Sequence, residues 1–285
     1  MRRSIRLCVV FALLAGASGI LGACSSKSDD APARPPRAYR VLVFTKCVTY
    51  CHKSIPNGAQ AIVELGAEND FDVDVTDDNT VFDDAMLEPY AAVVFLSTAV
   101  ENDVEPPFGG GPNPARNAFI MTGEQQSAFE RYIRRGRGYV GIHAASDGDY
   151  KWDFYVGLVG GMFKNHATKS EPFEVATLRV EDQRHPSTAG IGATWSRSEE
   201  WYNFKDNPRA RVHVLVSLDE STYAAKPKMG GDHPIAWCQE YAGGRSFYTA
   251  FGHAPESYSE PLFRKHIAGG IAWAAGVKPG NCAPP

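Results

Sequence analysis

The sequence lacks three features that would point to particular classes of protein. It has no run of basic residues, and its 33 acidic side chains outnumber its 29 basic ones, which argues against nucleic acid as a partner. The apolar segment Cys8–Ile20 is too short to span a bilayer comfortably. No internal repeat is present, so the chain is not an array of repeated units.

The N-terminal segment has the pattern of an export signal. Three arginines within the first six residues precede the apolar segment Cys8–Ile20, which ends in Leu21-Gly-Ala-Cys24. This ending resembles the lipobox of bacterial lipoproteins, which implies that residues 1–23 are removed and that Cys24 is lipidated. A serine follows Cys24, which favours the outer membrane, on the periplasmic side or at the cell surface. An ordinary cleaved signal peptide is the alternative, and both predict export.

The rest of the chain divides by composition into a linker, a domain and a tail. Residues 25–38 contain no large apolar side chain and are rich in serine, proline and charge, so they cannot bury a core. We therefore expect a flexible linker over residues 24–38. Residues 39–278 are long enough for one α/β domain with insertions. Residues 279–285 form a short tail.

Four cysteines remain outside the N-terminal segment, and an exported protein meets an oxidising compartment. Four cysteines allow three pairings, which sequence alone cannot distinguish. We favour a local Cys47–Cys51 disulfide together with a Cys238–Cys282 disulfide that ties down the C-terminus. A zinc site built from Cys47, Cys51 and His52 is the alternative.

Apolar runs alternate with helical patterns in the N-terminal half. The order β-α-β-α-β-α-β implies a parallel sheet with right-handed crossovers. Ser54 is expected to cap a helix that Gly66 ends, and Thr122 with Gln125 forms a capping box. The long segment 97–121 between a strand and a helix is typical of a lid or an insertion. The expected elements are strands 40–44, 71–75, 91–96 and 139–142, helices 55–65 and 122–135, and a short helical turn between the second and third strands.

The C-terminal half has a different pattern, with strands joined by loops. We expect strands at 173–180, 212–218, 234–239 and 245–251, which would extend the sheet in antiparallel fashion. An amphipathic helix over 259–275 closes the chain.

Histidines follow three of the predicted strands. The run Tyr139-Val-Gly-Ile ends at His143 and leads to Asp147. The first strand runs on to His52, and Ser246-Phe-Tyr-Thr-Ala-Phe-Gly ends at His253. Ligands of open parallel sheets bind beyond the carboxyl ends of the strands. The sequence therefore predicts one cleft lined by imidazoles.

Several motifs follow one another along the chain. They are Phe44-Thr-Lys46 with His52–Pro56, Gly141–Asp147, Gly157–Phe163 with His166, Glu199–Tyr202, Asp232–Trp237 and Gly244–His253. In this order they resemble the ThuA-like (trehalose utilisation) family over about residues 39–276. The resemblance implies a flavodoxin-like fold similar to that of class I glutamine amidotransferases. It also implies work on small carbohydrates such as trehalose derivatives, often beside a sugar 3-dehydrogenase, so 3-keto-glycosides are the expected substrates.

The elbow position that carries the cysteine nucleophile in amidotransferases is His143 in this chain. Amidotransfer by a thiolate is therefore not expected, because a shared fold does not carry its reaction with it.

The candidate residues suit proton removal beside a carbonyl and stabilisation of the resulting enediolate. A neutral imidazole suits a base near neutral pH, so His143 is the candidate base, with Asp147 to orient it or accept a sugar hydroxyl. His52, His253 and Arg245 could stabilise an oxyanion. The flat faces that could carry a pyranose ring are Trp152, Trp201 and Trp237. The further polar candidates for substrate binding are His166, Glu200, Asp232 and His233.

Each candidate also has a purely structural interpretation. His143 could be a hydrogen-bonded residue at a strand end, the tryptophans could be core residues, and Asp232 and His233 could belong to a turn before Pro234. Histidines and acids that converge on a cleft are suitable ligands for zinc or another divalent ion. No compact spacing such as H-x-x-x-H is present, so the sequence leaves the metal open.

The function expected from these residues is that of a lyase, hydrolase or isomerase of oxidised glycosides. Two alternatives remain, a non-catalytic sugar-binding lipoprotein and a metal-dependent hydrolase of another substrate.

Overall fold

The computed structural model describes residues 37–48, 50–99, 120–167 and 173–285. The predicted signal peptide, the lipidation site at Cys24, nearly all of the linker and most of the 97–121 segment lie outside these residues. Within the described part of the chain, no helix combines the length and the apolar character needed to cross a bilayer.

A nine-stranded sheet forms the centre of the fold, and five of its strands are parallel to one another. Their order is β2-β1-β3-β4-β11, which corresponds to the 2-1-3-4-5 order of flavodoxin-like folds. Every residue of β3 and β4 is buried, as expected of strands with both faces covered. The bounds are β1 Tyr39–Phe44, β2 Phe71–Thr76, β3 Ala92–Leu96, β4 Gly138–Ile142 and β11 Gly244–Thr249.

The C-terminal half extends this sheet with antiparallel strands, as predicted. β10 (Pro234–Tyr241), β9 (His213–Leu218), β6 (Val175–Val180) and β7 (Thr194–Ser198) follow β11 in spatial order. Two further strands, β5 (Phe163–His166) and β8 (Tyr202–Phe204), pair in a separate small sheet.

One strand differs from the prediction in its direction. β11 is antiparallel to β10 but parallel to β4, so it joins the two halves of the sheet. The β10–β11 hairpin turns through Ala242 and Gly243, both at positive φ, as a two-residue turn requires. The hairpin thereby places β11 beside β4, and β11 runs in the same direction as β1, β2, β3 and β4.

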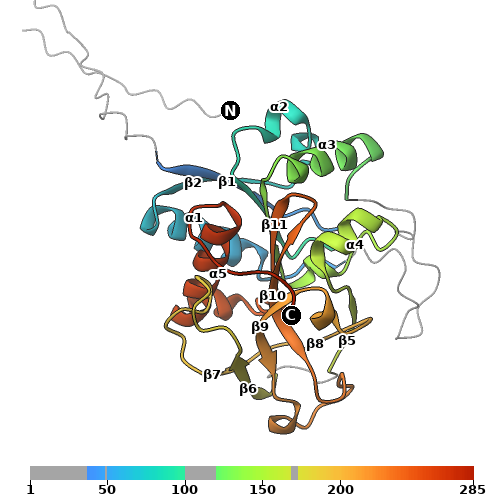
Figure 1. Ribbon diagram of the computed structural model, residues 1–285, viewed down its shortest axis with the longest axis vertical. Coiled ribbons are helices and arrows are strands. Elements are labelled where there is room, and N and C mark those ends of the chain that lie inside the picture. Colours follow the sequence, from blue (N-terminus) through green and yellow to red (C-terminus); the bar gives the residue numbers. More distant parts are fainter. Residues whose placement is uncertain (1–36, 49, 100–119, 168–172) are drawn as a thin grey trace, which may run out of the picture. The chain divides into compact units, whose positions relative to one another are not determined.

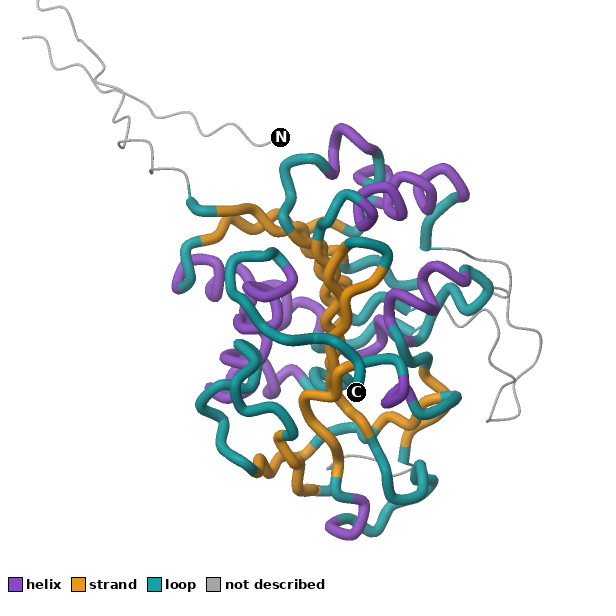
Figure 2. The backbone as a smooth tube through the Cα atoms, in the orientation of Figure 1, coloured by secondary structure: helices purple, strands orange, loops and turns teal. Residues whose placement is uncertain are grey.

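Helices cover both faces of the parallel strands. Figure 1 shows α1 and α5 on one side of the sheet and α3 and α4 on the other, and Figure 2 shows the same layers as a tube. The bounds are α1 Ile55–Glu68, α2 Asp84–Leu87, α3 Gly123–Arg134, α4 Asp153–Val159 and α5 Pro261–Ala274.

The predicted ends of α1 are corrected by the structure. The Ser54 hydroxyl does not cap the helix but donates to the carbonyl oxygen of Gly252, 2.9 Å away. Gly66 does not end the helix either. A side chain there would come within 2.6 Å of the Phe71 carbonyl oxygen, so Gly66 permits close packing on β2. The capping box of Thr122 and Gln125 is confirmed at the start of α3.

Both preferred disulfides are present. Cys47 is bonded to Cys51, and Cys238 is bonded to Cys282. The alternative zinc site at Cys47, Cys51 and His52 is therefore wrong, because its two thiols form a disulfide.

Two core histidines make the stability of the fold depend on pH. His266 and His185 are buried, and burial lowers their pKa values to about 3 and about 4. The unfolded chain binds protons on these groups near pH 6.5, whereas the folded protein does not. We expect the free energy of unfolding to fall as the pH drops from 6.5 towards 4, with a slope of about 1.4 kcal/mol per pH unit for each histidine.

Denaturant unfolding at a series of pH values, in wild type and His266→Gln, checks this expectation. The variant has one titrating core group fewer, so its slope should be shallower. An identical slope in both proteins would contradict it.

Candidate metal centre

The loops beyond three parallel strands bring three histidines to one place. His52 follows β1, His143 follows β4 and His253 follows β11, so all three lie beyond carboxyl ends of the sheet. Glu200 joins them from the segment between β7 and β8. One ligand atom from each of these four residues lies within 4.8 Å of all the others. We call these four residues the His–Glu cluster.

The distances within the cluster are close to those of a coordination sphere. His143 Nε2 lies 3.1 Å from His52 Nε2, 3.3 Å from His253 Nδ1 and 3.4 Å from Glu200 Oε2. His253 Nδ1 lies 2.9 Å from the same Glu200 oxygen. Ligands of a tetrahedral zinc ion with Zn–N bonds of 2.0–2.1 Å are about 3.3–3.4 Å apart. These four distances are thus close to those that such an ion requires.

His143 is held at a strained turn. Its φ is +53°, in the left-handed region, which costs a residue with a side chain about 1–3 kcal/mol. Its carbonyl oxygen accepts a hydrogen bond from the Tyr248 hydroxyl at 2.9 Å. Its Nδ1 lies 2.8 Å from the carbonyl oxygen of Ala250, so Nδ1 donates to that oxygen and Nε2 faces the cluster.

The electrostatics keep His52 neutral and Glu200 ionised. Burial, followed by the neighbouring His143 and His253, lowers the pKa of His52 to about 2, so this imidazole is neutral. Burial alone would raise the pKa of Glu200, but hydrogen bonds and charges from His143 and His253 outweigh it and lower that pKa. A neutral imidazole and an ionised carboxylate are the forms that bind a metal ion.

The chemistry of these donors fits a divalent transition metal. Imidazole nitrogens with one carboxylate oxygen suit zinc and its neighbours better than calcium or magnesium, which prefer oxygen. The backbone hydrogen bond to the outer nitrogen of His143 is the support that metal-binding histidines usually have.

Two other predicted residues, His166 and Asp147, supply none of the four ligand atoms. His166, at the end of β5, places Nε2 3.5 Å from Glu200 Oε1 and is partly exposed. Asp147 follows the short helix η2 (His143–Ser146) and accepts a hydrogen bond from the Tyr150 hydroxyl.

Sequence reasoning missed the aromatic rings that surround the cluster. The Tyr50 ring packs edge-on against His52 at 4.7 Å between centroids, and 51% of this residue is exposed. Phe173 contacts His253 at 4.9 Å, and Tyr202 lies on His143 at 4.3 Å. Tyr50 and Tyr202 each lie two residues from a cluster residue in the sequence, His52 and Glu200 respectively. This short separation could have indicated that their rings lie near the cluster.

Within the described residues, the tryptophans proposed as sugar platforms are not among the rings that contact the cluster histidines. Trp201 and Trp237 are buried, and their indole N–H groups donate to the carbonyl oxygens of Glu174 and Val159. Trp152 stacks on Tyr155 beside α4.

Arg245 is also not brought to the cluster. It is in register with Gly138, at the amino ends of β11 and β4, whereas His143 follows the carboxyl end of β4. Its guanidinium donates to the Trp273 carbonyl oxygen.

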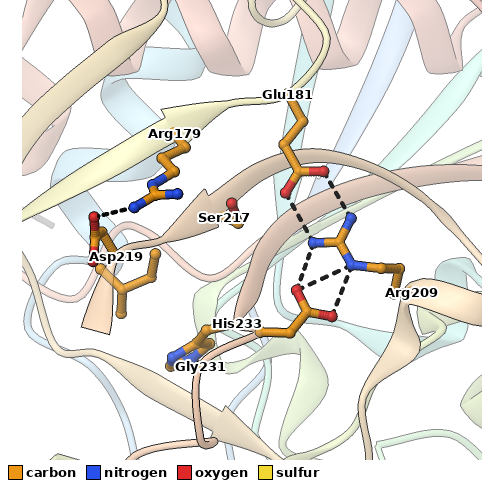
Figure 3. A pocket seen from close by; sticks show the side chains of 9 residues that line it. Arg179, Glu181, Arg209, Ser217, Asp219, Gly231 and His233 are labelled. Atoms are coloured by element: carbon orange, nitrogen blue, oxygen red, sulfur yellow. Dashed lines mark hydrogen bonds and ion pairs between the residues drawn. The ribbon is translucent and has the colours of Figure 1, made fainter. Parts of the chain in front are cut away.

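Asp232 and His233 line a separate polar pocket of about 330 Å³ on the antiparallel half of the sheet. Figure 3 shows Arg209 in this pocket, hydrogen-bonded to Glu181. Arg209 also donates to the Asp232 carboxylate. His233 is buried, with Nδ1 3.0 Å from Glu220 and Nε2 2.7 Å from the Tyr202 carbonyl oxygen. These two residues therefore do not contact the His–Glu cluster directly.

Comparisons with known proteins agree with this architecture. The structure is similar to that of a ThuA-like protein from Bacteroides uniformis, with 22% identity, a TM-score of 0.66, and 86% of this chain and 94% of the other covered. A ThuA-like protein from Parabacteroides merdae is similar at 18% identity and a TM-score of 0.59, with coverage of 83% and 90%. At these identities the likeness shows the fold alone. No curated protein matches the sequence.

The sequence itself matches the trehalose utilisation family, ThuA, over residues 40–274. This match spans most of the chain and includes every strand of the parallel sheet except the first residue of β1. The chain therefore belongs to the ThuA family.

Proposed function

We propose that this protein is a metal-dependent enzyme that acts on oxidised small carbohydrates, such as 3-keto-glycosides. The observation that carries the proposal is the convergence of His52, His143, His253 and Glu200 beyond the ends of the parallel strands. We further propose that the protein is exported and held at the membrane by a lipid on Cys24, as the N-terminal sequence predicts.

The four residues would hold one divalent ion. Such an ion supplies a Lewis acid, which stabilises negative charge on an oxygen next to the reacting carbon. His143 would then be a ligand and not the base expected from the sequence, because its one Nε2 lone pair cannot serve both roles.

His166 is the better candidate for proton transfer. It lies beside Glu200 but outside the four ligand atoms, and it is partly exposed. An imidazole is suited to move protons near neutral pH. Asp147, with the Tyr150 hydroxyl bonded to it, offers a polar partner for a sugar hydroxyl.

The carbohydrate part of the proposal rests on two observations. The family is described by trehalose utilisation. The exposed ring of Tyr50 and the partly buried ring of Phe173 lie against cluster histidines, where a pyranose could stack on them. Thiolate chemistry has no support, because every cysteine in the described ranges is in a disulfide.

The first prediction concerns metal content. Protein purified without chelators should contain about one divalent ion per chain by elemental analysis. Removing the ion should lower the Tm, and zinc at about 100 times Kd should restore about 2.7 kcal/mol of stability. His143→Ala should weaken binding by more than the 10–100-fold that is typical when only a supporting group of a ligand is lost.

His213→Ala is the matched control. His213 lies on β9 and pairs with Asp182, outside the cluster. This variant should keep the ion. Equal metal affinity in both variants, or no specific ion in wild type, would overturn the metal centre.

The second prediction concerns the reaction. Wild type loaded with metal should consume 3-keto forms of disaccharides such as trehalose, followed by NMR, including exchange of the proton next to the carbonyl. His166→Ala should keep the metal but slow turnover by about 10²–10⁴-fold, the usual contribution of a general acid or base.

Binding of these sugars without turnover would instead support a non-catalytic sugar-binding protein. Metal binding without any sugar binding would favour a metal-dependent hydrolase of another substrate.

A further inference from the structure

A buried ion pair lies directly beside the His–Glu cluster. Arg197 Nη2 is 3.0 Å from Glu199 Oε2, and the exposed fractions of the two side chains are 1% and 0%. The rings that enclose the guanidinium are Trp195, Phe251 and Phe263. Buried ion pairs are weak contributors to stability, because the cost of removing the charges from water offsets their attraction. Stability alone therefore does not account for this pair.

The hydrogen bonds of the Glu199 carboxylate reach the backbone of two cluster residues. Oε2 accepts from the amide of Gly252 at 2.9 Å, in addition to Arg197. Oε1 accepts from the amides of His253 and Glu200, each at 3.1 Å. Each carboxylate oxygen thus accepts two N–H groups, and three of the four belong to the segments that carry His253 and Glu200.

Gly252 extends this network to a third cluster residue. Its φ is +111°, a conformation that favours glycine, and a side chain there would come within 2.6 Å of the Tyr258 hydroxyl. Its carbonyl oxygen accepts from the hydroxyl of Ser54, two residues after His52. Gly252 is therefore held at both of its backbone polar groups. Glu199 accepts from its amide, and Ser54 donates to its carbonyl oxygen.

We propose that Glu199 is the positioning residue of the cluster, and that Arg197 compensates its buried charge. Glu199 holds the backbone of residues 252–253 and 200, so that the ligand atoms of His253 and Glu200 converge with that of His52. The purpose of this arrangement rests on the proposed metal centre, whereas the backbone restraint can be measured without metal.

Glu199→Gln is a sharp test because the variant has nearly the same shape. An amide has one oxygen and one NH2 group, and the NH2 group cannot accept a hydrogen bond. In either orientation of the amide, the NH2 group would face two N–H donors, so two hydrogen bonds are lost.

We expect two effects of Glu199→Gln. Affinity for zinc, measured by competition with a chelator, should fall about 10–100-fold, as when the support of a metal ligand is removed. In the metal-free protein, hydrogen exchange should become at least tenfold faster for the amide of Gly252 or of His253, whichever faces the NH2 group, while amides of β4 stay protected.

Glu181→Gln is the control. Glu181 is also paired with an arginine, because it accepts two hydrogen bonds from Arg209, but it lies in the separate pocket of Figure 3. This variant should leave zinc affinity and both amides unchanged.

The double variant Arg197→Met/Glu199→Gln separates positioning from folding, because it also removes the arginine that would otherwise lose its buried carboxylate partner. If the pair only stabilises the fold, the double variant should recover zinc affinity along with its Tm. If Glu199 positions the ligands, the Tm recovers and the affinity stays low.

Unchanged exchange of the Gly252 and His253 amides in Glu199→Gln would overturn the positioning role, even if wild type binds zinc. Suppose instead that either amide exchanges faster in Glu199→Gln, but that wild type binds no zinc. That result would support the restraint of the backbone by Glu199 and refute the metal centre. The two proposals can therefore fail separately.

Discussion

The parallel pairing of β4 with its two neighbours is the constraint on which the site depends. Ile142 is in register with Leu96 of β3 and with Thr249 of β11, so three strands end at one edge of the sheet. His143 follows β4 immediately, and His253 follows β11 after a turn through Gly252. Two imidazoles from distant parts of the sequence meet because the chain crosses the sheet in the same direction each time.

The second half of the fold supplies the carboxylate of the His–Glu cluster. Glu200 enters the cluster from the connection between β7 and β8, and its neighbour Glu199 faces the other way, towards the backbone. The two adjacent carboxylates therefore have different partners. Glu200 contacts the imidazoles, and Glu199 accepts hydrogen bonds from backbone amides. The Arg197 guanidinium makes the second charge tolerable in a buried place.

Burying three imidazoles and a carboxylate together is unfavourable without a cation to share. The lowered pKa of His52 follows from this crowding, because a protonated ring there would lose its hydration and face neighbouring rings. The strained turn at His143 adds to the cost. Unfavourable local arrangements of this kind are typical of functional sites, where the surrounding structure enforces them.

The sequence by itself determined the local features of this protein. The spacing of apolar residues and the capping residues indicated the strands and helices. The capping box at Thr122 could be predicted because it involves only four consecutive residues. The strand-histidine pattern predicted that His52, His143 and His253 share one edge, since that edge follows from a parallel sheet alone. Ser54 and Gly66 were misjudged, because their partners, Gly252 and Phe71, lie outside the helix.

Only the tertiary structure decided which polar and aromatic residues join the histidines. Asp147 and Glu200 were both candidate acids, yet the path of the β7–β8 connection makes Glu200 the one whose carboxylate oxygen joins the imidazole nitrogens. Trp237 and Arg245 lie in adjacent strands, but one is buried in the core and the other lies at the opposite end of the sheet. Register and strand direction are set by partners far away in sequence, so the composition of a motif cannot reveal which way its side chains face.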